Sequence, residues 1–165
     1  TFIKSCAQLL GKKAGGFYTE EIPGEGIRGR RGFRLVTLTG ESHLLAEVDT
    51  QSSYHVGRYG VFLNVLDQVG APTIWQSIEN PELSWILIDE IGRMEEGSAK
   101  FKEALLDALS SPKRILASIR WHDSLFTQAI KQRDDVALYK LTVPNRESLS
   151  AHLKILLFED ENFSS

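Results

Sequence analysis

The chain has 165 residues, of which 42% are hydrophobic and 25% charged, and its formal net charge is −3 at pH 7. This length suffices for one domain with a sizeable core, and the small negative charge gives no general attraction to nucleic acid or to an anionic membrane. No apolar run approaches the roughly 20 residues that a membrane-spanning helix needs, and a single cysteine, Cys6, excludes an internal disulfide and favours a reducing, cytoplasmic setting.

The first residues predict a helix followed by an antiparallel sheet. Residues 2–10 carry apolar groups at helical spacing, and Gly11 ends that run. Two β-rich segments, 16–22 and 31–38, flank a glycine-rich connector, which is typical of an antiparallel hairpin. Residues 43–48 add a third expected strand.

Two helices are expected next, at 60–69 and 71–79, and the chain then alternates strands with helices. Short apolar runs without alternation are typical of strands buried on both faces. Three such runs follow, at 85–89, 114–119 and 136–142. A helical pattern comes after each run, and the residues expected to cap these helices are Ser98, Asp123 and Asn145.

This alternation predicts an α/β fold of three layers, in which helices flank a parallel sheet. The hairpin is then an insertion near the N-terminus. We expect one domain over residues 1–158 and an acidic, flexible tail over 159–165.

Two adjacent carboxylates, Asp89 and Glu90, end the apolar run in WILIDEIG (85–92). Ligands of open α/β sheets bind beyond the carboxyl ends of the parallel strands, so the pair points to a ligand site. In P-loop nucleoside triphosphatases an Asp there holds Mg²⁺ through water, and a following Glu orients or deprotonates the attacking water. The alternative is that both carboxylates cap the following loop or lie in solvent.

Four further segments surround DEIGRMEE (89–96) in a fixed order: GFYTEE (16–21), GFRLVTL (32–38), VGRYGV (56–61) and PNRE (144–147). Together they resemble the small P-loop nucleoside-triphosphatase family first described from thermophiles, over residues 1 to about 150. The resemblance implies a P-loop fold and Mg²⁺-dependent hydrolysis of ATP, GTP or another nucleoside triphosphate. Arg93 departs from the pattern, because the family has lysine there.

The resemblance also implies roles for particular residues. Glu90 is the expected catalytic residue and Asp89 the Mg²⁺ residue. The pair Asn145 and Arg146 would lie near the base of the nucleotide, or would simply be a helix cap followed by a solvated arginine. Glu20 or Glu21 could order the Mg²⁺ shell or the attacking water, or both could lie at an exposed strand end, and Arg93 could contact phosphate.

The phosphate-binding pattern G-x-x-x-x-G-K-[ST] does not occur in the sequence. In the family this loop ends in GKTT, followed by an apolar pair and a lysine, so TFIK (1–4) resembles the continuation from the second threonine. We therefore expect Thr1 to follow the Mg²⁺-binding hydroxyl and residues 2–10 to form the helix that faces the phosphates. The loop and its strand would precede residue 1, and the 165 residues alone would be inactive.

Two local patterns favour structure over function. Gly24, Gly26 and Gly29 match the dinucleotide-binding pattern G-x-G-x-x-G, which requires a following helix, whereas a strand follows here. Four arginines of the same region favour a solvated hairpin over a nucleic-acid site, because the chain is acidic and no aromatic residues lie between them; they are Arg28, Arg30, Arg31 and Arg34.

Two functions compete with hydrolysis. Phosphoryl transfer to a small acceptor, as in nucleotide kinases, would use the same fold but needs an acceptor pocket and a lid. A non-catalytic nucleotide-sensing or interaction module would have no use for an intact Asp89-Glu90 pair.

Overall fold

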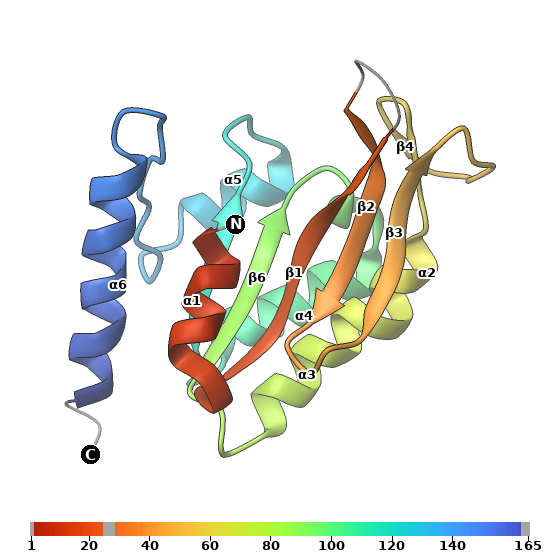
Figure 1. Cartoon of the computed structure of the whole chain (residues 1–165). Helices are drawn as coiled ribbons and strands as arrows, with labels where there is room; N and C mark the ends of the chain where they lie inside the picture. The colour runs from red at the N-terminus through yellow and green to blue at the C-terminus, as the bar shows by residue number, and fades with distance from the viewer. Residues whose placement is uncertain (1, 25–28, 163–165) are drawn as a thin grey trace.

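The computed structural model describes residues 2–24 and 29–162, with side chains through Leu157. In this part of the chain the strands form one sheet of seven, in the order β4-β5-β3-β2-β1-β6-β7 (Figure 1). Their bounds are β1 Ala14–Pro23, β2 Arg30–Thr37, β3 Ser42–Val48, β4 His55–Val56, β5 Tyr59–Val61, β6 Trp85–Ile91 and β7 Arg114–Ile119.

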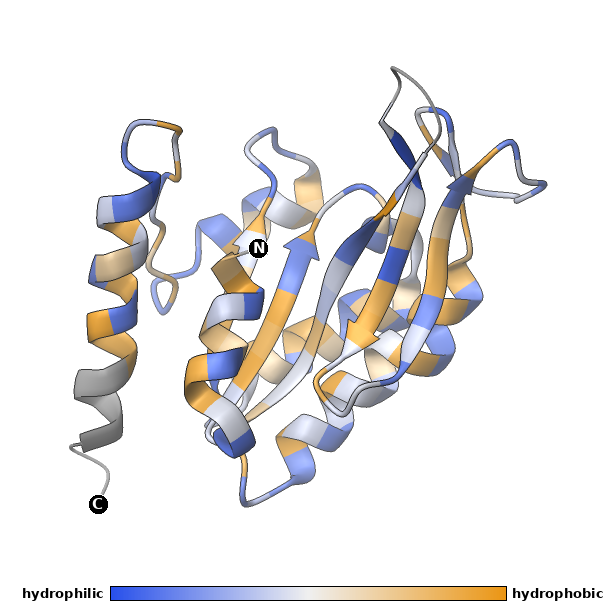
Figure 2. Cartoon of the chain, in the orientation of Figure 1, coloured by the Kyte–Doolittle hydropathy of each residue, from blue (hydrophilic) through white to orange (hydrophobic). Residues whose placement is uncertain are grey.

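The sheet is mixed. β1, β6 and β7 are parallel, while β1, β2, β3, β5 and β4 pair antiparallel in turn. The expected hairpin is therefore confirmed, as is the third strand. β6 lies between β1 and β7 and is buried from Trp85 to Asp89, which explains why its sequence is apolar without alternation. It is hydrophobic along most of its length and hydrophilic near its upper end (Figure 2).

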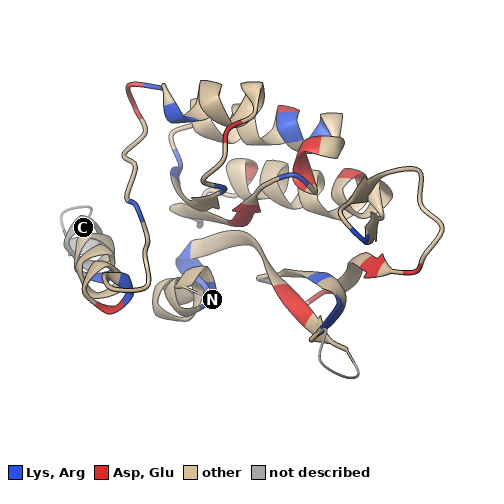
Figure 3. Cartoon of the chain, turned by 90° about the horizontal axis from the view of Figure 1, so that it is seen from above, with Lys and Arg blue, Asp and Glu red and all other residues tan. Residues whose placement is uncertain are grey.

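Helices cover both faces of the sheet, which gives the expected three layers (Figure 3). α1 (Phe2–Leu10) and α6 (Arg146–Asn162) lie on one face. The opposite face carries α2 (Leu63–Val65), a π-helical turn η2 (Leu66–Gly70), α3 (Ala71–Glu79), α4 (Ala99–Ser110) and α5 (Leu125–Lys131). Two 3₁₀ turns complete the elements, η1 (Gly11–Lys13) and η3 (Glu95–Gly97). Because α6 runs to Asn162, it passes the predicted domain boundary at residue 158, which stays a prediction.

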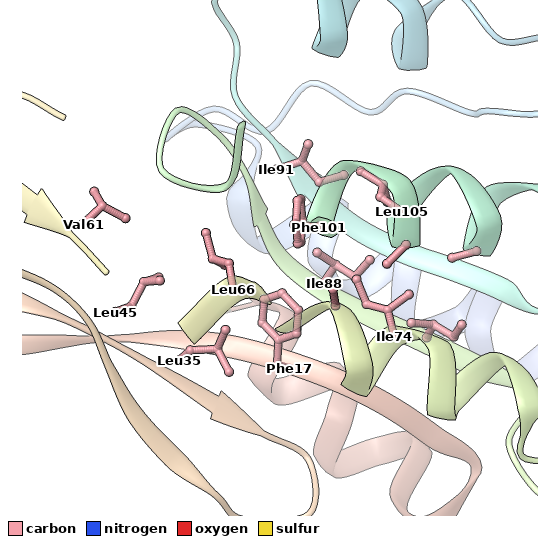
Figure 4. Close-up of a cluster of buried hydrophobic side chains, with 14 of the residues drawn as sticks. Phe17, Leu35, Leu45, Val61, Leu66, Ile74, Ile88, Ile91, Phe101 and Leu105 are labelled. Atoms are coloured by element: carbon pink, nitrogen blue, oxygen red, sulfur yellow. The ribbon is translucent and has the colours of Figure 1, made fainter. Parts of the chain in front are cut away.

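The larger core lies between the sheet and the helices α3 and α4 (Figure 4). Phe17 of β1 meets Phe101 of α4 edge-on, with ring centroids 6.2 Å apart. The smaller core lies on the other face, where Ile3 and Cys6 of α1 contact β6 and Leu157 of α6. Burial raises the pKa of the Cys6 thiol to about 11, so this cysteine is an inert core residue.

The predicted strand at 136–142 is wrong. This segment forms no strand, and its side chains Leu138, Tyr139 and Leu141 are about half exposed. A strand needs a hydrogen-bonding neighbour, and no strand in the described ranges pairs with the segment or with the outer edge of β7. The expected burial of 114–119 is also only partial, because every residue of β7 keeps some exposure at this edge.

Two other expectations are corrected. The helix predicted at 60–69 begins only at Leu63, because Tyr59–Val61 is strand β5, which pairs with β3 and β4. The cap of α5 is Ser124, not Asp123. The Ser124 hydroxyl accepts a hydrogen bond from the Thr127 N–H, while Asp123 pairs with Lys131. Ser98 caps α4 as expected.

Candidate functional site

Asp89 and Glu90 lie at the carboxyl end of β6, where the sequence predicts a ligand site. Asp89 is 7% exposed and lies on the α1 side of the sheet, as does Leu87. Ser118 of β7 donates a hydrogen bond of 2.9 Å to Asp89 Oδ1. Asp89 Oδ2 is buried and has no hydrogen-bond partner among the described residues. The strand thus presents one fixed carboxylate with an unused oxygen.

Glu90 lies toward the other side of the sheet, beside Phe33 and Leu45, which pack in the larger core. Its side chain is exposed and lines a pocket of about 220 Å³. Partial desolvation and the neighbouring Asp89 charge raise the pKa of Glu90, and Arg120 opposes this shift. A carboxylate with a raised pKa is a better proton acceptor, which suits a general base.

The residues after the pair form a tight turn around a third carboxylate. Glu95 is 4% exposed, and its Oε2 accepts a hydrogen bond of 3.1 Å from the Gly92 N–H. Burial is the largest cause that raises the pKa of Glu95 to about 8, with smaller contributions from Glu90 and Asp89. A Cβ at Gly92 would lie 2.9 Å from Glu90 Oε1, so glycine leaves room for the Glu90 carboxyl group.

Sequence reasoning missed Glu95. The available signal was the acidic pair Glu95-Glu96 in RMEE, which follows Asp89-Glu90 after one short turn. Two glutamates in sequence gave no means of telling which is buried. In the structure Glu95 is buried, whereas Glu96 accepts a hydrogen bond from Ser124 Oγ.

Arg93 lies beside Glu90 at the rim of the same pocket. Its backbone carbonyl accepts a hydrogen bond of 2.7 Å from the Tyr54 hydroxyl, which fastens the turn to the segment before β4. Arg120 lines the pocket as well, and its backbone N–H donates a hydrogen bond of 3.1 Å to the Ile91 carbonyl. Arg93 and Glu90 thus line the same pocket, and Arg120 is a lining residue that the sequence did not suggest.

Glu20 lies on β1 and forms an ion pair with Lys4 of α1, so it belongs to the α1 side of the sheet. This pair lies at the N-terminal end of α1, and the Lys4 ammonium also lies 5.0 Å from the centre of the Tyr18 ring. Thr1, the other residue expected near the phosphates, lies outside the described residues.

Asn145 and Arg146 lie at the start of α6. The Asn145 carbonyl accepts from the Leu149 N–H, so Asn145 occupies the N-cap position. Its side chain instead holds the preceding turn, accepting from the Thr142 N–H at 2.7 Å and donating to the Lys140 carbonyl at 2.8 Å. Arg146 is exposed. The start of α6 lies toward the same end of the molecule as the end of β6 (Figure 1).

Asp89 fits a Mg²⁺ site of the expected kind. Protein Mg²⁺ sites commonly use one or two carboxylates and fill the remaining positions with water and substrate phosphates. Among the described residues no group of three or more His, Cys, Asp or Glu could hold an ion, so a site at Asp89 would be of this open type. The buried Asp89 Oδ2 is the oxygen available to it.

The other sequence candidates have structural roles. A hydrogen bond from the Gly24 N–H to the Gly29 carbonyl closes the connector between β1 and β2, as expected for a hairpin. Gly26 and Arg28 lie outside the described residues. Arg30 pairs with Glu21 and Arg31 with Glu47. In the ranges the structure describes, no helix is long and apolar enough to cross a membrane.

Comparison with known proteins gives consistent matches over most of the chain. The family model described as NTPase matches residues 1–154. The nucleoside-triphosphatase THEP1 of Thermotoga sp. (strain RQ2) is 41% identical over 149 residues, which are 90% of this chain and 83% of that protein. THEP1 of Methanocaldococcus jannaschii is 39% identical over 143 residues, which are 85% of this chain and 77% of that protein.

Two solved structures share the fold. The crystal structure of THEP1 from the hyperthermophile Aquifex aeolicus has a TM-score of 0.80 and 28% identity, and the match covers 92% of this chain and 88% of that one. The solution structure of a human cancer-related nucleoside triphosphatase has a TM-score of 0.77 and 30% identity. The match covers 94% of this chain and 89% of that one.

Proposed function

Because the chain belongs to the NTPase family and is a nucleoside triphosphatase, we propose that it hydrolyses a nucleoside triphosphate to diphosphate and phosphate with Mg²⁺ as cofactor. The reaction would take place at the carboxyl ends of β6 and β7. The observation that carries this proposal is the pair formed by Asp89, with its buried unused oxygen, and the more accessible Glu90.

Asp89 would hold the metal ion, directly or through water, while Ser118 keeps the carboxylate in one orientation. When bound, Mg²⁺ neutralises charge on the β- and γ-phosphates. Glu90 would orient the attacking water and accept its proton. The raised pKa of Glu90 supports this role, because it brings the carboxylate closer to the pH at which the enzyme works.

The geometry around α1 supports a phosphate site at its N-terminal end. The Lys4–Glu20 pair fixes this end of α1 against β1, on the side of the sheet where Asp89 lies. Helix N-termini favour phosphate because their first N–H groups have no partner within the helix. Thr1 would precede this turn, and Glu20 would help to order the metal shell.

A phosphate-binding loop is needed as well, and we propose that residues before Thr1 supply it in the full-length protein. The pattern G-x-x-x-x-G-K-[ST] has no match in residues 1–165. The outer edge of β7 supports the proposal, because no strand pairs with it in the described ranges and a parallel strand could be added there.

Asn145 and Arg146 are proposed to lie near the nucleotide base. Asn145 holds the turn before α6 through two hydrogen bonds, which would fix the start of the helix and leave the exposed Arg146 to contact the base or ribose. Arg93, at the rim of the Glu90 pocket, is proposed to contact the γ-phosphate.

The test is Glu90→Gln in the full-length protein. Hydrolysis of Mg²⁺-ATP and Mg²⁺-GTP should fall by roughly 10²–10⁴-fold, the usual scale for a positioned base, while nucleotide affinity changes little. Glu103→Gln, an exposed glutamate on α4, is the matched control and should keep full turnover. Unchanged turnover in Glu90→Gln would remove Glu90 from the mechanism.

A further inference from the structure

The pocket beside Glu90 is much larger than hydrolysis requires. Its volume is about 220 Å³, whereas a single water needs only about 10–15 Å³ of cavity volume. The pocket lies on the α4 side of the sheet, opposite the α1 side on which the phosphates and Asp89 are proposed to lie. Glu90 thus stands between the proposed phosphate site and a separate small-molecule cavity.

Part of the pocket wall is apolar. Phe33 of β2, Leu45 of β3 and Val56 of β4 line it, and Met94 lines it from the turn after β6. The Phe33 ring packs edge-on against Tyr59, with centroids 5.1 Å apart and planes at 69°, so its orientation is fixed. An apolar wall that includes a packed aromatic ring suits one face of a ring compound.

Another part of the wall carries the guanidinium group of the half-buried Arg120, while Arg93, proposed above to contact the γ-phosphate, lies at the rim. Neither side chain forms a hydrogen bond or an ion pair within the part of the chain that the structure describes. Guanidinium groups bind carboxylate and phosphate through paired N–H donors, and burial strengthens this preference. The wall therefore suits an anionic group.

We propose that this pocket binds a ring compound that carries one anionic group and at least one hydroxyl group, and that this hydroxyl accepts the γ-phosphoryl group in place of water. The proposal rests on the proposed function, since it uses the same nucleotide and the same Glu90. The ring lies on the Phe33 wall, the anion binds Arg120, and the hydroxyl lies between Thr19 and Glu90, both of which line the pocket.

The transfer balances without a further reactant. The acceptor oxygen bonds to the γ-phosphorus as the bond from that phosphorus to the β–γ bridging oxygen breaks. The bridging oxygen keeps the electron pair and leaves on the nucleoside diphosphate. The hydroxyl proton passes to the Glu90 carboxylate. The products are a phosphate monoester and a diphosphate.

The experiment uses full-length protein, Mg²⁺ and ATP labelled at the γ-phosphate, with either 4-hydroxybenzoate or ribose 5-phosphate at millimolar concentration. The first probe offers a carboxylate on a flat ring, and the second offers a phosphate on a hydroxylated sugar ring. Label is separated into inorganic phosphate and phosphate ester. Ester should form with at least one probe, about tenfold or more above the protein-free background. The probe that is labelled identifies which anion the pocket takes.

Two variants tie the ester to the pocket. Val56→Phe fills the cavity and should shift the ratio of ester to inorganic phosphate downward by about tenfold. Arg120→Gln should raise the acceptor KM by about tenfold more than the nucleotide KM. Leu125→Phe, at a side chain that is 90% exposed on α5, is the control and should change neither quantity.

If neither probe is labelled and neither alters the rate of hydrolysis, the acceptor pocket is refuted while the hydrolase stands. If Val56→Phe and Arg120→Gln change only the nucleotide KM, the pocket binds part of the nucleotide and no acceptor, and the proposal is likewise refuted. Absence of hydrolysis in every sample would instead contradict the proposed function.

Discussion

At the scale of single residues, the two oxygens of Asp89 differ in their surroundings. Oδ1 accepts a hydrogen bond from Ser118, whereas Oδ2 is buried without a partner among the described residues. A buried polar atom left without a hydrogen bond costs about 1–3 kcal/mol, more when it carries charge. If Mg²⁺ binds at Asp89 as proposed, the ion or its bound water would offset this cost.

Asp89→Ala should therefore remove the Mg²⁺-dependent part of nucleotide affinity, a loss of about 10–100-fold. Titration of a fluorescent nucleotide with and without Mg²⁺ measures it, and the two curves should coincide in the variant. Asp134→Ala, at an exposed aspartate far along the chain, should keep the wild-type difference. A full Mg²⁺ effect in Asp89→Ala would exclude Asp89 from the metal shell.

Glu95 makes stability depend on pH in an unusual direction. Burial raises its folded-state pKa to about 8, above the ordinary value of 4.5. The folded state then binds more protons than the unfolded state between these two values, so the contribution of Glu95 to stability is largest below about pH 4.5 and declines as the pH rises to about 8. The negative charges of Glu90 and Asp89 also raise the pKa of Glu95.

We expect Glu95→Gln to become more stable relative to the wild type as the pH rises from about 5 to about 8. The change in the difference between their free energies of unfolding should be on the order of 3–5 kcal/mol. Urea unfolding at several pH values measures this difference. Glu79→Gln, at an exposed glutamate, provides the comparison, and parallel curves for wild type and Glu95→Gln would show that Glu95 ionises normally.

At the scale of elements, local patterns predicted those elements whose partners are near in sequence. The hairpin β1–β2 and the capped helix α4 are of this kind. Gly16 and Gly32 show why the family segments need particular residues, since a Cβ would lie 2.1 Å from the Leu87 carbonyl oxygen at Gly16 and 2.3 Å from that of Ala46 at Gly32. These close approaches join β1 to β6 and β2 to β3.

The errors arose where pairing is distant in sequence. Tyr59–Val61 is too short for its strand to be recognised from periodicity, and pairing with β3 is what joins it and β4 to the rest of the sheet. Residues 136–142 have a strand-like sequence, yet no neighbour pairs with them. The pocket could not be predicted for the same reason, because its lining comes from β1, β2, β3, β4, β6 and the two turns that follow β6 and β7, which only the tertiary fold brings together.

The start of α4 offers a test of element stability. Ser98 is 2% exposed, accepts a hydrogen bond from the Phe101 N–H and donates one to Asp67. Ser98→Ala removes the cap and leaves Asp67 without this donor, so it should lower the free energy of unfolding by about 1–2 kcal/mol. Ser110→Ala, at an exposed serine of the same helix, should change stability by less than about 0.5 kcal/mol. Equal effects of the two variants would contradict the role of the cap.

At the scale of the whole molecule, one side of the sheet is incompletely covered. The outer edge of β7 pairs with no strand in the described ranges, and several large apolar side chains are exposed nearby in sequence, namely Trp121, Leu125, Leu138, Tyr139, Leu141 and Val143. An unpaired strand edge beside exposed apolar groups favours association between chains. A strand added to β7 from the proposed phosphate-binding segment would cover this edge and give residues 136–142 a partner.

Residues 1–165 expressed alone should therefore aggregate, unfold over a broad temperature range and show no measurable hydrolysis of Mg²⁺-ATP. The expected loss of activity is complete if the loop lies before Thr1 as proposed, because Asp89 and Glu90 remain but the pattern G-x-x-x-x-G-K-[ST] has no match in these residues. The full-length protein should show a sharp thermal transition together with turnover, since the proposed upstream strand would both complete the sheet and carry the loop. Calorimetry and a phosphate-release assay on both proteins measure the two properties. Robust Mg²⁺-dependent hydrolysis by residues 1–165 would show that these residues bind the phosphates by themselves, and would overturn the proposed position of the loop.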